Sequence, residues 1–373
     1  MDKNHNFRPA WLEINLNNLS CNFRKIKKIV SPSVKILACV KKDAYGHGLI
    51  EVSKRLVEEG VDYLGVACLD EGIRLRMANI NKPILVMGAV LPQDTEPFFK
   101  YDIIASVSDW SFVYALGKKA QYLNKKIKVH IKIDTGMGRL GILFPHAYEF
   151  IKRVNKLKFI EIEGLFTHFP LADTDKNFTF KQIECFKKLR ENLSQDNIHI
   201  PIYHAANSIA TVLYKESHFD MVRPGIILYG IYPKKGLNIG LKPVMSLKAK
   251  IVLVKKVPSR YGISYGHTYH TLRPTHIAVL PVGYGDGYPR LLSNKAKVII
   301  RGKKFRICGI ICMDQFMVDT GYFKPKVNEE AVLIGSQGNV SISAEELAYL
   351  AKTIPYEIIT SLGNRLVRVS PKL

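Results

Sequence analysis

The amino-acid sequence predicts a (β/α)8 TIM barrel followed by a mostly antiparallel C-terminal β domain. From about residue 30 to residue 240, short runs rich in β-branched residues alternate with amphipathic segments. Parallel strands need a crossover between them, usually a helix, so this alternation favours a parallel barrel. After Lys242-Pro243 the strand-like runs follow one another, separated by turns that contain Gly, Pro or Asn. Because 373 residues suffice for two domains, we expect the barrel over residues 1–242 and the β domain over residues 243–373.

Each expected element is placed by its own run of residues. The barrel strands are expected at 34–40, 63–67, 84–87, 103–107, 127–133, 160–166, 202–204 and 221–228. The helices between them are expected at 49–59, 70–78, 111–123, 145–156, 178–193 and 208–214. The second-domain strands are expected at 244–257, 276–281, 296–300, 304–311 and 332–334. A helix is expected at 343–351, because Ser343 and Glu346 have the spacing of a capping box.

Composition and charge limit the class of protein. The formal net charge is +23, but the lysines are scattered as doublets with no basic arm or aromatic-basic module, so we expect no nucleic-acid partner. No apolar run approaches the roughly 18 residues that a membrane span needs, and residues 1–19 lack an apolar signal stretch. None of the six cysteines forms a Cys-x-x-Cys pair, and no histidine has zinc-finger spacing. The sequence therefore predicts a cytoplasmic protein without a metal site.

Polar and glycine-rich clusters accompany the expected strands at their C-terminal ends. They lie beside the first, fifth, sixth, seventh and eighth strands, at residues 41–48, 134–139, 167–169, 205–208 and 221–225. Barrel enzymes carry their active sites on the loops at this end of the strands. The placement therefore predicts an active site built from these clusters.

Each cluster has an ordinary and a functional interpretation. Lys41 ends an apolar strand and could be a surface lysine with a buried stem, but beside a glycine-rich turn it could also form an imine. Asn207-Ser208 is an ordinary helix N-cap unless an anion is present, in which case the free backbone donors become a phosphate site. Tyr265 lies in a glycine-containing turn, where an exposed tyrosine is the common case. Together, a lysine, a phosphate cradle and arginines suited to a heteroaromatic ring are the groups that pyridoxal phosphate needs.

A series of ordered motifs resembles those of bacterial alanine racemases. The motifs lie at residues 40–48 (Val-Lys-Lys-Asp-Ala-Tyr-Gly-His-Gly), 130–141, 204–208, 220–225, 242–247, 264–266, 281–284 and 312–315. They cover nearly the whole chain in the family's order. The resemblance implies a pyridoxal-phosphate-dependent isomerase that interconverts L-alanine and D-alanine and supplies D-alanine for peptidoglycan.

The resemblance also implies two catalytic bases. Lys41 would hold the cofactor covalently and act on one face of the substrate. Tyr265 would act on the opposite face and would come from the partner subunit, as would the backbone of Met313, which meets the substrate carboxylate. The second domain would thus complete the partner's active site, and the chain would work as a homodimer with shared sites.

The remaining implied roles concern the cofactor. Arg223 would hydrogen-bond the pyridine nitrogen, and Arg139 would contact the phenolic oxygen and lie near the substrate carboxylate. Lys132 resembles a lysine that can be carbamylated, and His168 would link Tyr265 to Arg223. The expected phosphate contacts are Tyr45, Ser208, Gly225, Ile226 and Tyr356.

The chain departs from the family's pattern at a few positions. Ile310 stands where arginine is usual at the substrate entrance, Pro170-Leu171 replaces small residues, and Lys42 replaces an alanine. These departures leave the substrate range open, with a serine or lysine racemase as an alternative. A barrel-type decarboxylase is another, since Cys312 could pass for the cysteine of that class. A non-catalytic alternative is a small cofactor carrier built on the same barrel, but proteins of that class lack a β domain. A nucleic-acid-binding role is supported by the net charge alone.

Overall fold

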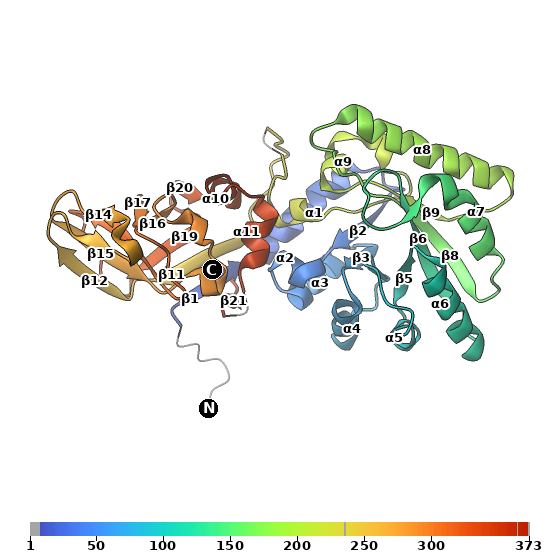
Figure 1. Cartoon of the computed structure of the whole chain (residues 1–373), viewed down its shortest axis with the longest axis horizontal. Coiled ribbons are helices and arrows are strands. Elements are labelled where there is room, and N and C mark those ends of the chain that lie inside the picture. The colour runs from blue at the N-terminus through green and yellow to red at the C-terminus, as the bar shows by residue number, and fades with distance from the viewer. Residues whose placement is uncertain (1–7, 235, 364, 372–373) are drawn as a thin grey trace.

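The structure is a computed structural model that describes residues 8–234, 236–363 and 365–371. It has two lobes side by side (Figure 1), one made of helices around a parallel sheet and the other of a mostly antiparallel sheet. The expected fold class, a TIM barrel followed by a mostly antiparallel β domain, is confirmed. Across these residues, no helix combines the length and the apolar character needed to span a lipid bilayer.

The barrel strands follow one another around the sheet in chain order, except that the last lies beside the first. They are β2 (Lys35–Cys39), β3 (Tyr63–Val66), β4 (Ile84–Val86), β5 (Ile104–Val107), β6 (Ile127–Asp134), β8 (Ile160–Phe166), β9 (Ile202–His204) and β10 (Met221–Val222). The backbone N–H groups of Lys35 and Cys39 donate to the carbonyls of Asp220 and Pro224, each at 2.9 Å. This pairing joins the first strand to the last, so the ends of β2 and β10 lie side by side.

Helices surround the barrel strands (Figure 1). They are α1 (Leu16–Ile29), α3 (Leu49–Glu58), α4 (Leu69–Met77), α5 (Glu96–Lys100), α6 (Trp110–Tyr122), α7 (Phe144–Asn155), α8 (Lys176–Gln195) and α9 (Ser208–Leu213). Helix α6 begins after Asp109, whose carboxylate accepts the N–H of Phe112 at 2.9 Å. Helices α1 and α5 were not expected, although α1 buries Leu19, Phe23 and Ile26 at helical spacing.

The eighth barrel strand is shorter than the sequence predicted. The expected strand at 221–228 is replaced by the two residues of β10 and by a 3-10 helix, η2 (Ile226–Tyr229). Pro224 lies between them and has no backbone N–H, so the ladder of hydrogen bonds cannot continue through it. The strand prediction was wrong at 226–228 because the residues of η2 are apolar and buried, and a short buried helix and a buried strand have the same apolar sequence pattern.

The second domain is built on a long sheet. Its strands are β11 (Met245–Lys250), β12 (Leu253–Val257), β15 (Thr275–Leu280), β16 (Lys297–Ile300), β17 (Lys303–Cys308), β18 (Phe316–Gly321), β19 (Glu330–Gln337) and β20 (Val340–Ile342). A small hairpin of β13 (Gly262–Ile263) and β14 (Tyr269–His270) lies apart. The expected strand at 244–257 is two strands, because β11 pairs with β19 whereas β12 pairs with β15. Strand β18 was not expected.

The first strand of the chain lies in the second sheet rather than in the barrel. Strand β1 (Ala10–Ile14) runs antiparallel to β11 and parallel to β21 (Val367–Val369). Its residues alternate between buried and half-buried, which is the pattern of a strand covered on one face. No strand was expected here, and these residues were placed with the barrel because they precede it in the chain. Figure 1 shows β1 among the strands of the C-terminal lobe.

The two domains meet at the loop that follows β2. Helix α10 (Ala344–Ala351) begins at Ser343, whose hydroxyl accepts the N–H of Glu346 as expected, and α11 (Pro355–Ser361) contacts the turn after Val40. The Arg368 guanidinium lies 2.8 Å from the Asp43 carboxylate and donates to the carbonyl of Gly46 at 2.9 Å. The second domain therefore fixes the backbone that follows the first barrel strand.

Two glycines should respond oppositely to replacement by alanine. A Cβ at Gly230, where φ is +77°, would lie 1.9 Å from the carbonyl oxygen of Lys242, whereas one at Gly117 in α6 meets nothing within 4 Å. We expect Gly230→Ala to lower the free energy of unfolding by about 3 kcal/mol, and Gly117→Ala to raise it by about 0.5–1 kcal/mol. Urea unfolding of both variants measures this, and equal effects would contradict the packing described here.

Candidate active site

Lys41 follows β2 at the end of the barrel where active sites form. It begins a short turn, α2 (Lys41–Tyr45), in which φ lies between 53° and 54° from Lys42 to Tyr45. This left-handed backbone costs non-glycine residues about 1–2 kcal/mol each. A strained segment of this kind persists only where surrounding contacts stabilise it. It determines the direction in which the backbone continues after Lys41.

Asp43 and Glu71 hold the strained turn. The Asp43 carboxylate accepts the N–H of Leu49 at 3.0 Å and pairs with Arg368. Glu71, which is buried, accepts the N–H groups of Asp43 and Ala67 at 3.2 and 2.9 Å. The Lys41 position is thus fixed by carboxylates on both sides of the turn.

Arg223 is a buried guanidinium at the end of β10. One terminal nitrogen donates to the carbonyls of Thr167 and Ala205 at 2.6 and 2.9 Å, and the other lies 3.2 Å from Nδ1 of His204. Burial lowers the pKa of Arg223 to about 10, yet it stays charged at neutral pH. All of these partners are neutral, so the charge of Arg223 is not matched by a carboxylate in direct contact.

Several cations converge at this end of the barrel. Burial and then the charges of Arg139, Arg223 and Lys41 lower the pKa of Lys132 to about 8. Burial and the same cations, together with Lys132, lower the pKa of His168 well below its ordinary value. A cluster with this excess of positive charge is suited to anionic ligands such as phosphates and carboxylates.

The glycine-rich loop after β6 is organised by Asp134. Its buried carboxylate accepts the N–H groups of Gly136, Met137 and Gly138, each at 2.8 Å. Burial alone would raise the pKa of Asp134, but these backbone donors hold it below its ordinary value. The loop presents Arg139 as an exposed side chain at the edge of the cationic region.

The expected phosphate contacts lie together where β10 ends. The N–H of Gly225 donates to the Ser208 hydroxyl at 2.9 Å. A Cβ at Gly225 would lie 2.4 Å from the Tyr45 hydroxyl, so only glycine fits there. The rings of Tyr45 and Tyr356 have centroids 6.1 Å apart, and Ile226 begins η2. Hydroxyls and backbone N–H groups at the start of short helices form a cradle suited to phosphate.

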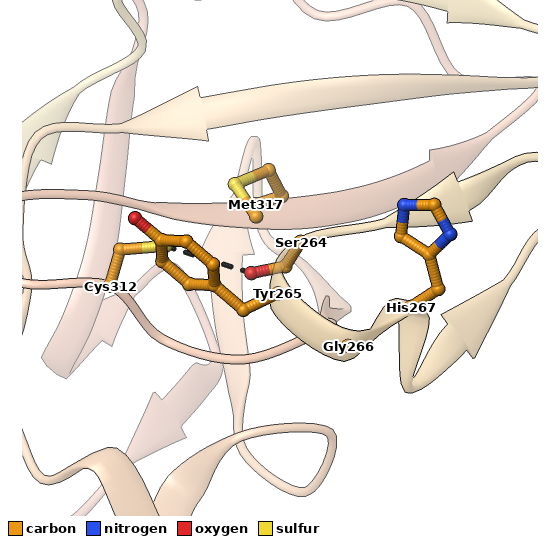
Figure 2. A pocket seen from close by; sticks show the side chains of 6 residues that line it. All are labelled: Ser264, Tyr265, Gly266, His267, Cys312 and Met317. Atoms are coloured by element: carbon orange, nitrogen blue, oxygen red, sulfur yellow. Dashed lines mark hydrogen bonds between the residues drawn. The ribbon is translucent and has the colours of Figure 1, made fainter.

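Tyr265 is held rigidly on the second domain. It follows Ser264, whose φ of 65° is unusual for a residue other than glycine, and the Ser264 hydroxyl donates to the carbonyl of Ile310 at 2.6 Å. The Tyr265 side chain is 71% exposed. Figure 2 shows its ring over Cys312 at an open concavity that His267 and Met317 also line.

The structure does not bring all the predicted residues together within one chain. Lys41, Lys132, Arg139, His168 and Arg223 share the barrel site. Tyr265 and Met313, in contrast, belong to the C-terminal lobe, and β14, the strand that follows Tyr265 in the chain, lies at the end of that lobe farthest from the barrel (Figure 1). Both side chains are more than half exposed, which leaves them available to another molecule.

Sequence reasoning missed a group of buried side chains beneath Arg223. His130, His204 and Glu163 are at most 8% exposed and are hydrogen-bonded in series. His130 and His204 lie within motifs that were recognised, but no role was assigned to them. Their signal was a polar residue at a buried position of a barrel strand.

Replacing Lys132 with methionine should stabilise the cofactor-free protein at neutral pH, because it removes a buried ammonium that neighbouring cations repel. The folded-state pKa of about 8 lies below the ordinary 10.5, so between these values the unfolded chain binds more protons and the natural protein gains stability as pH rises. We expect a difference of about 2 kcal/mol at pH 7 that shrinks toward zero by about pH 10.5. Urea unfolding across this range measures it, and a pH-independent difference would count against the cation cluster.

Comparison with known proteins agrees with the geometry. The sequence model of the alanine racemase N-terminal domain matches residues 14–233, and that of the C-terminal domain matches residues 244–370. An alanine racemase of Halothermothrix orenii is 49% identical over 365 residues, which is 97% of this chain and 96% of that protein.

Solved structures are similar over the same extent. The alanine racemase of Streptomyces lavendulae superposes with a TM-score of 0.94 at 32% identity, covering 99% of this chain and 98% of that one. The Bartonella henselae alanine racemase, described with covalently bound pyridoxal phosphate, gives 0.88 at 30% identity, covering 97% and 99%. Two domain matches in order, a relative close to half identical and a shared two-lobed fold leave a single assignment: the chain belongs to the alanine racemase family of isomerases.

Proposed function

We propose that the chain interconverts L-alanine and D-alanine with Lys41 of one copy and Tyr265 of the partner subunit as the two bases, supplying D-alanine for peptidoglycan. The observation that carries this proposal is that the candidate site residues are divided between the two lobes of the chain. The cluster of cations that includes Lys41 lies in the barrel, whereas Tyr265 belongs to the other lobe and is 71% exposed. A homodimer with shared sites brings the two together.

Pyridoxal phosphate fits the barrel site. Alanine racemases depend on this cofactor. The cradle of Tyr45, Ser208, Gly225, Ile226 and Tyr356 suits its phosphate, and glycine at 225 lets the backbone approach the Tyr45 hydroxyl more closely than a Cβ would allow. When bound, pyridoxal phosphate makes the α-proton of an amino acid acidic by accepting the electron pair left behind. The protein's task is to hold the group and to move that proton.

The barrel residues would orient the ring and the substrate. Lys41 would hold the cofactor and exchange the α-proton on one face. Arg223 would donate a hydrogen bond to the ring nitrogen, and since a guanidinium keeps its protons it would limit how much negative charge the ring takes up. Arg139, exposed at the edge of the site, and the backbone of Met313 from the partner subunit would bind the substrate carboxylate.

Two bases on opposite faces explain exchange in both directions. A proton removed by Lys41 on one face is replaced by Tyr265 of the partner subunit on the other, and the reverse exchange restores the first enantiomer. The substrate therefore need not rotate in the site. His168, which burial and the surrounding cations keep neutral, would accept a hydrogen bond from Arg223 on one ring nitrogen and donate the N–H of the other to Tyr265, which stabilises the tyrosine oxygen when it gives up its proton.

Lys132 is suited to carbamylation. Its pKa of about 8 leaves part of its amine neutral at physiological pH. A neutral amine adds to carbon dioxide and releases one proton, which converts a cation into an anionic carbamate. The carbamate would pair with Arg139 and relieve the repulsion among the cations of the pocket.

A carbamate at Lys132 should be visible by NMR. Protein equilibrated with ¹³C-bicarbonate should give a carbamate carbonyl signal that is lost on acidification, since acid releases carbon dioxide. Lys132→Gln should lack the signal, and Lys128→Gln, on the same strand but at the exposed base, should keep it. A signal that survives Lys132→Gln would mean that another amine is modified.

Activity and the division of the site can be tested together. Purified protein should form L-alanine from D-alanine and show a cofactor absorbance band that Lys41→Ala abolishes. Lys41→Ala and Tyr265→Phe homodimers should each lose at least about a hundredfold in turnover, since general acid–base catalysis contributes that much or more. A doubly tagged heterodimer of the two variants has one intact site of two and should regain about half of the natural activity per dimer.

The outcomes distinguish the alternatives. An inactive heterodimer would mean that Lys41 and Tyr265 act within one chain or not at all. A cofactor band without alanine turnover, tested beside serine and lysine as substrates, would assign the chain a different amino acid.

A further inference from the structure

Buried polar side chains form a hydrogen-bonded series through the inside of the barrel. Nδ1 of His204 on β9 lies 3.2 Å from Arg223, and its Nε2 lies 2.8 Å from Nδ1 of His130 on β6. Nε2 of His130 lies 3.1 Å from the Glu163 carboxylate on β8. Buried polar groups connected in this way are costly unless every member is paired, so the series needs a definite arrangement of protons.

The two ends of the series together determine that arrangement. A guanidinium can only donate, so Nδ1 of His204 must accept from Arg223, and the proton of this neutral ring lies on Nε2. That proton is donated to Nδ1 of His130, so the His130 proton also lies on Nε2. It is donated in turn to Glu163, which as a carboxylate only accepts. Every hydrogen bond therefore points the same way, from Arg223 to Glu163.

Burial supports neutral rings in this series. Burial lowers the pKa of His204 well below its ordinary value, with the charge of Arg223 adding to the effect. Burial also lowers the pKa of His130, although the hydrogen bond to Glu163 opposes this shift. The carboxylate of Glu163 is thus the negative end of a series whose positive end is Arg223.

The Glu163 end reaches the opposite face of the barrel. Its other carboxylate oxygen lies 2.7 Å from the Lys128 ammonium, which is about half exposed. Glu163 and Lys128 line a small pocket at the N-terminal ends of β5, β6 and β8, together with Glu161. The series therefore runs from the base of the barrel to its catalytic end.

We propose that Glu163, His130 and His204 are positioning residues that act as a one-way relay on Arg223, with Glu163 as its remote counter-charge. The relay fixes the His204 tautomer that accepts from Arg223 and so fixes where the remaining guanidinium N–H groups point. The effect of the relay on catalysis rests on the proposed function, in which Arg223 contacts the cofactor ring. The effect of the relay on the histidine tautomers is independent of that contact.

The relay is tested by removing its acceptor in two ways. Glu163→Gln keeps an oxygen that can accept from His130 but removes the charge, whereas Glu163→Leu removes both. Glu161→Leu is the matched control, because Glu161 lies on the same strand and lines the same pocket but is exposed and outside the relay. Protein labelled with ¹⁵N-histidine and loaded with cofactor reports the two neutral tautomers by NMR, and His130→Asn and His204→Asn assign the signals.

We expect both rings to carry their proton on Nε2 in the natural protein and in Glu161→Leu. In Glu163→Leu, His204 should carry its proton partly on Nδ1, two side chains away from the substitution, and kcat should fall about tenfold, or about 1.4 kcal/mol. Glu163→Gln should keep the natural tautomers and lose less activity. This rescue separates a relay from packing, since leucine and glutamine are of similar size.

Two results would overturn the relay. One is a proton on Nδ1 of His204 in the natural protein, because Arg223 could not then donate to it. The other is an unchanged His204 tautomer in Glu163→Leu. A chain with the expected tautomers but no alanine turnover would instead count against the proposed function and leave the relay standing.

Discussion

Closure of the barrel between β2 and β10 is the constraint on which the site depends. Lys41 and Arg223 are more than 180 residues apart in the chain and become neighbours only because the backbone of Lys35 and Cys39 pairs with the segment 220–224. The same pairing brings Gly225 so close to Tyr45 that a side chain at residue 225 would meet the Tyr45 hydroxyl. An open sheet of the same strands would carry the same residues without forming a site.

The closed barrel then concentrates positive charge at one end. The positive charges of Lys41, Arg139 and Arg223 contribute to lowering the pKa values of both Lys132 and His168. A buried group of like charges is unfavourable unless opposite charges compensate it. Anionic ligands can compensate this positive charge at the C-terminal end of the barrel strands. Glu163 can compensate it from the N-terminal end, through the hydrogen-bonded imidazoles of His130 and His204. The second domain contributes differently, since Arg368 pairs with Asp43 in the strained turn after Lys41 and Tyr265 is exposed on the surface of this domain.

Much of the fold was predictable because its signals are local. The first seven barrel strands were placed within a few residues, since parallel strands buried on both faces appear in the sequence as short apolar runs. The eighth strand was too long because the run 221–228 stays apolar through η2, and only the missing N–H of Pro224 ends the ladder. Strand β1 was not expected, and its residues were placed in the barrel domain, because its pairing with β11 joins segments distant in sequence.

The sequence by itself determined the fold class, the end of the barrel that carries the site, and most of the chemical groups in it. These follow from hydrophobic periodicity and from motifs whose residues lie close together in the chain. Only the tertiary structure decided which groups share a pocket, that Lys132 is surrounded by cations, and that His130, His204 and Glu163 connect to Arg223. The physical reason is that charge interactions and hydrogen bonds depend on distances in space, and these are set by closure of the barrel rather than by separation along the chain.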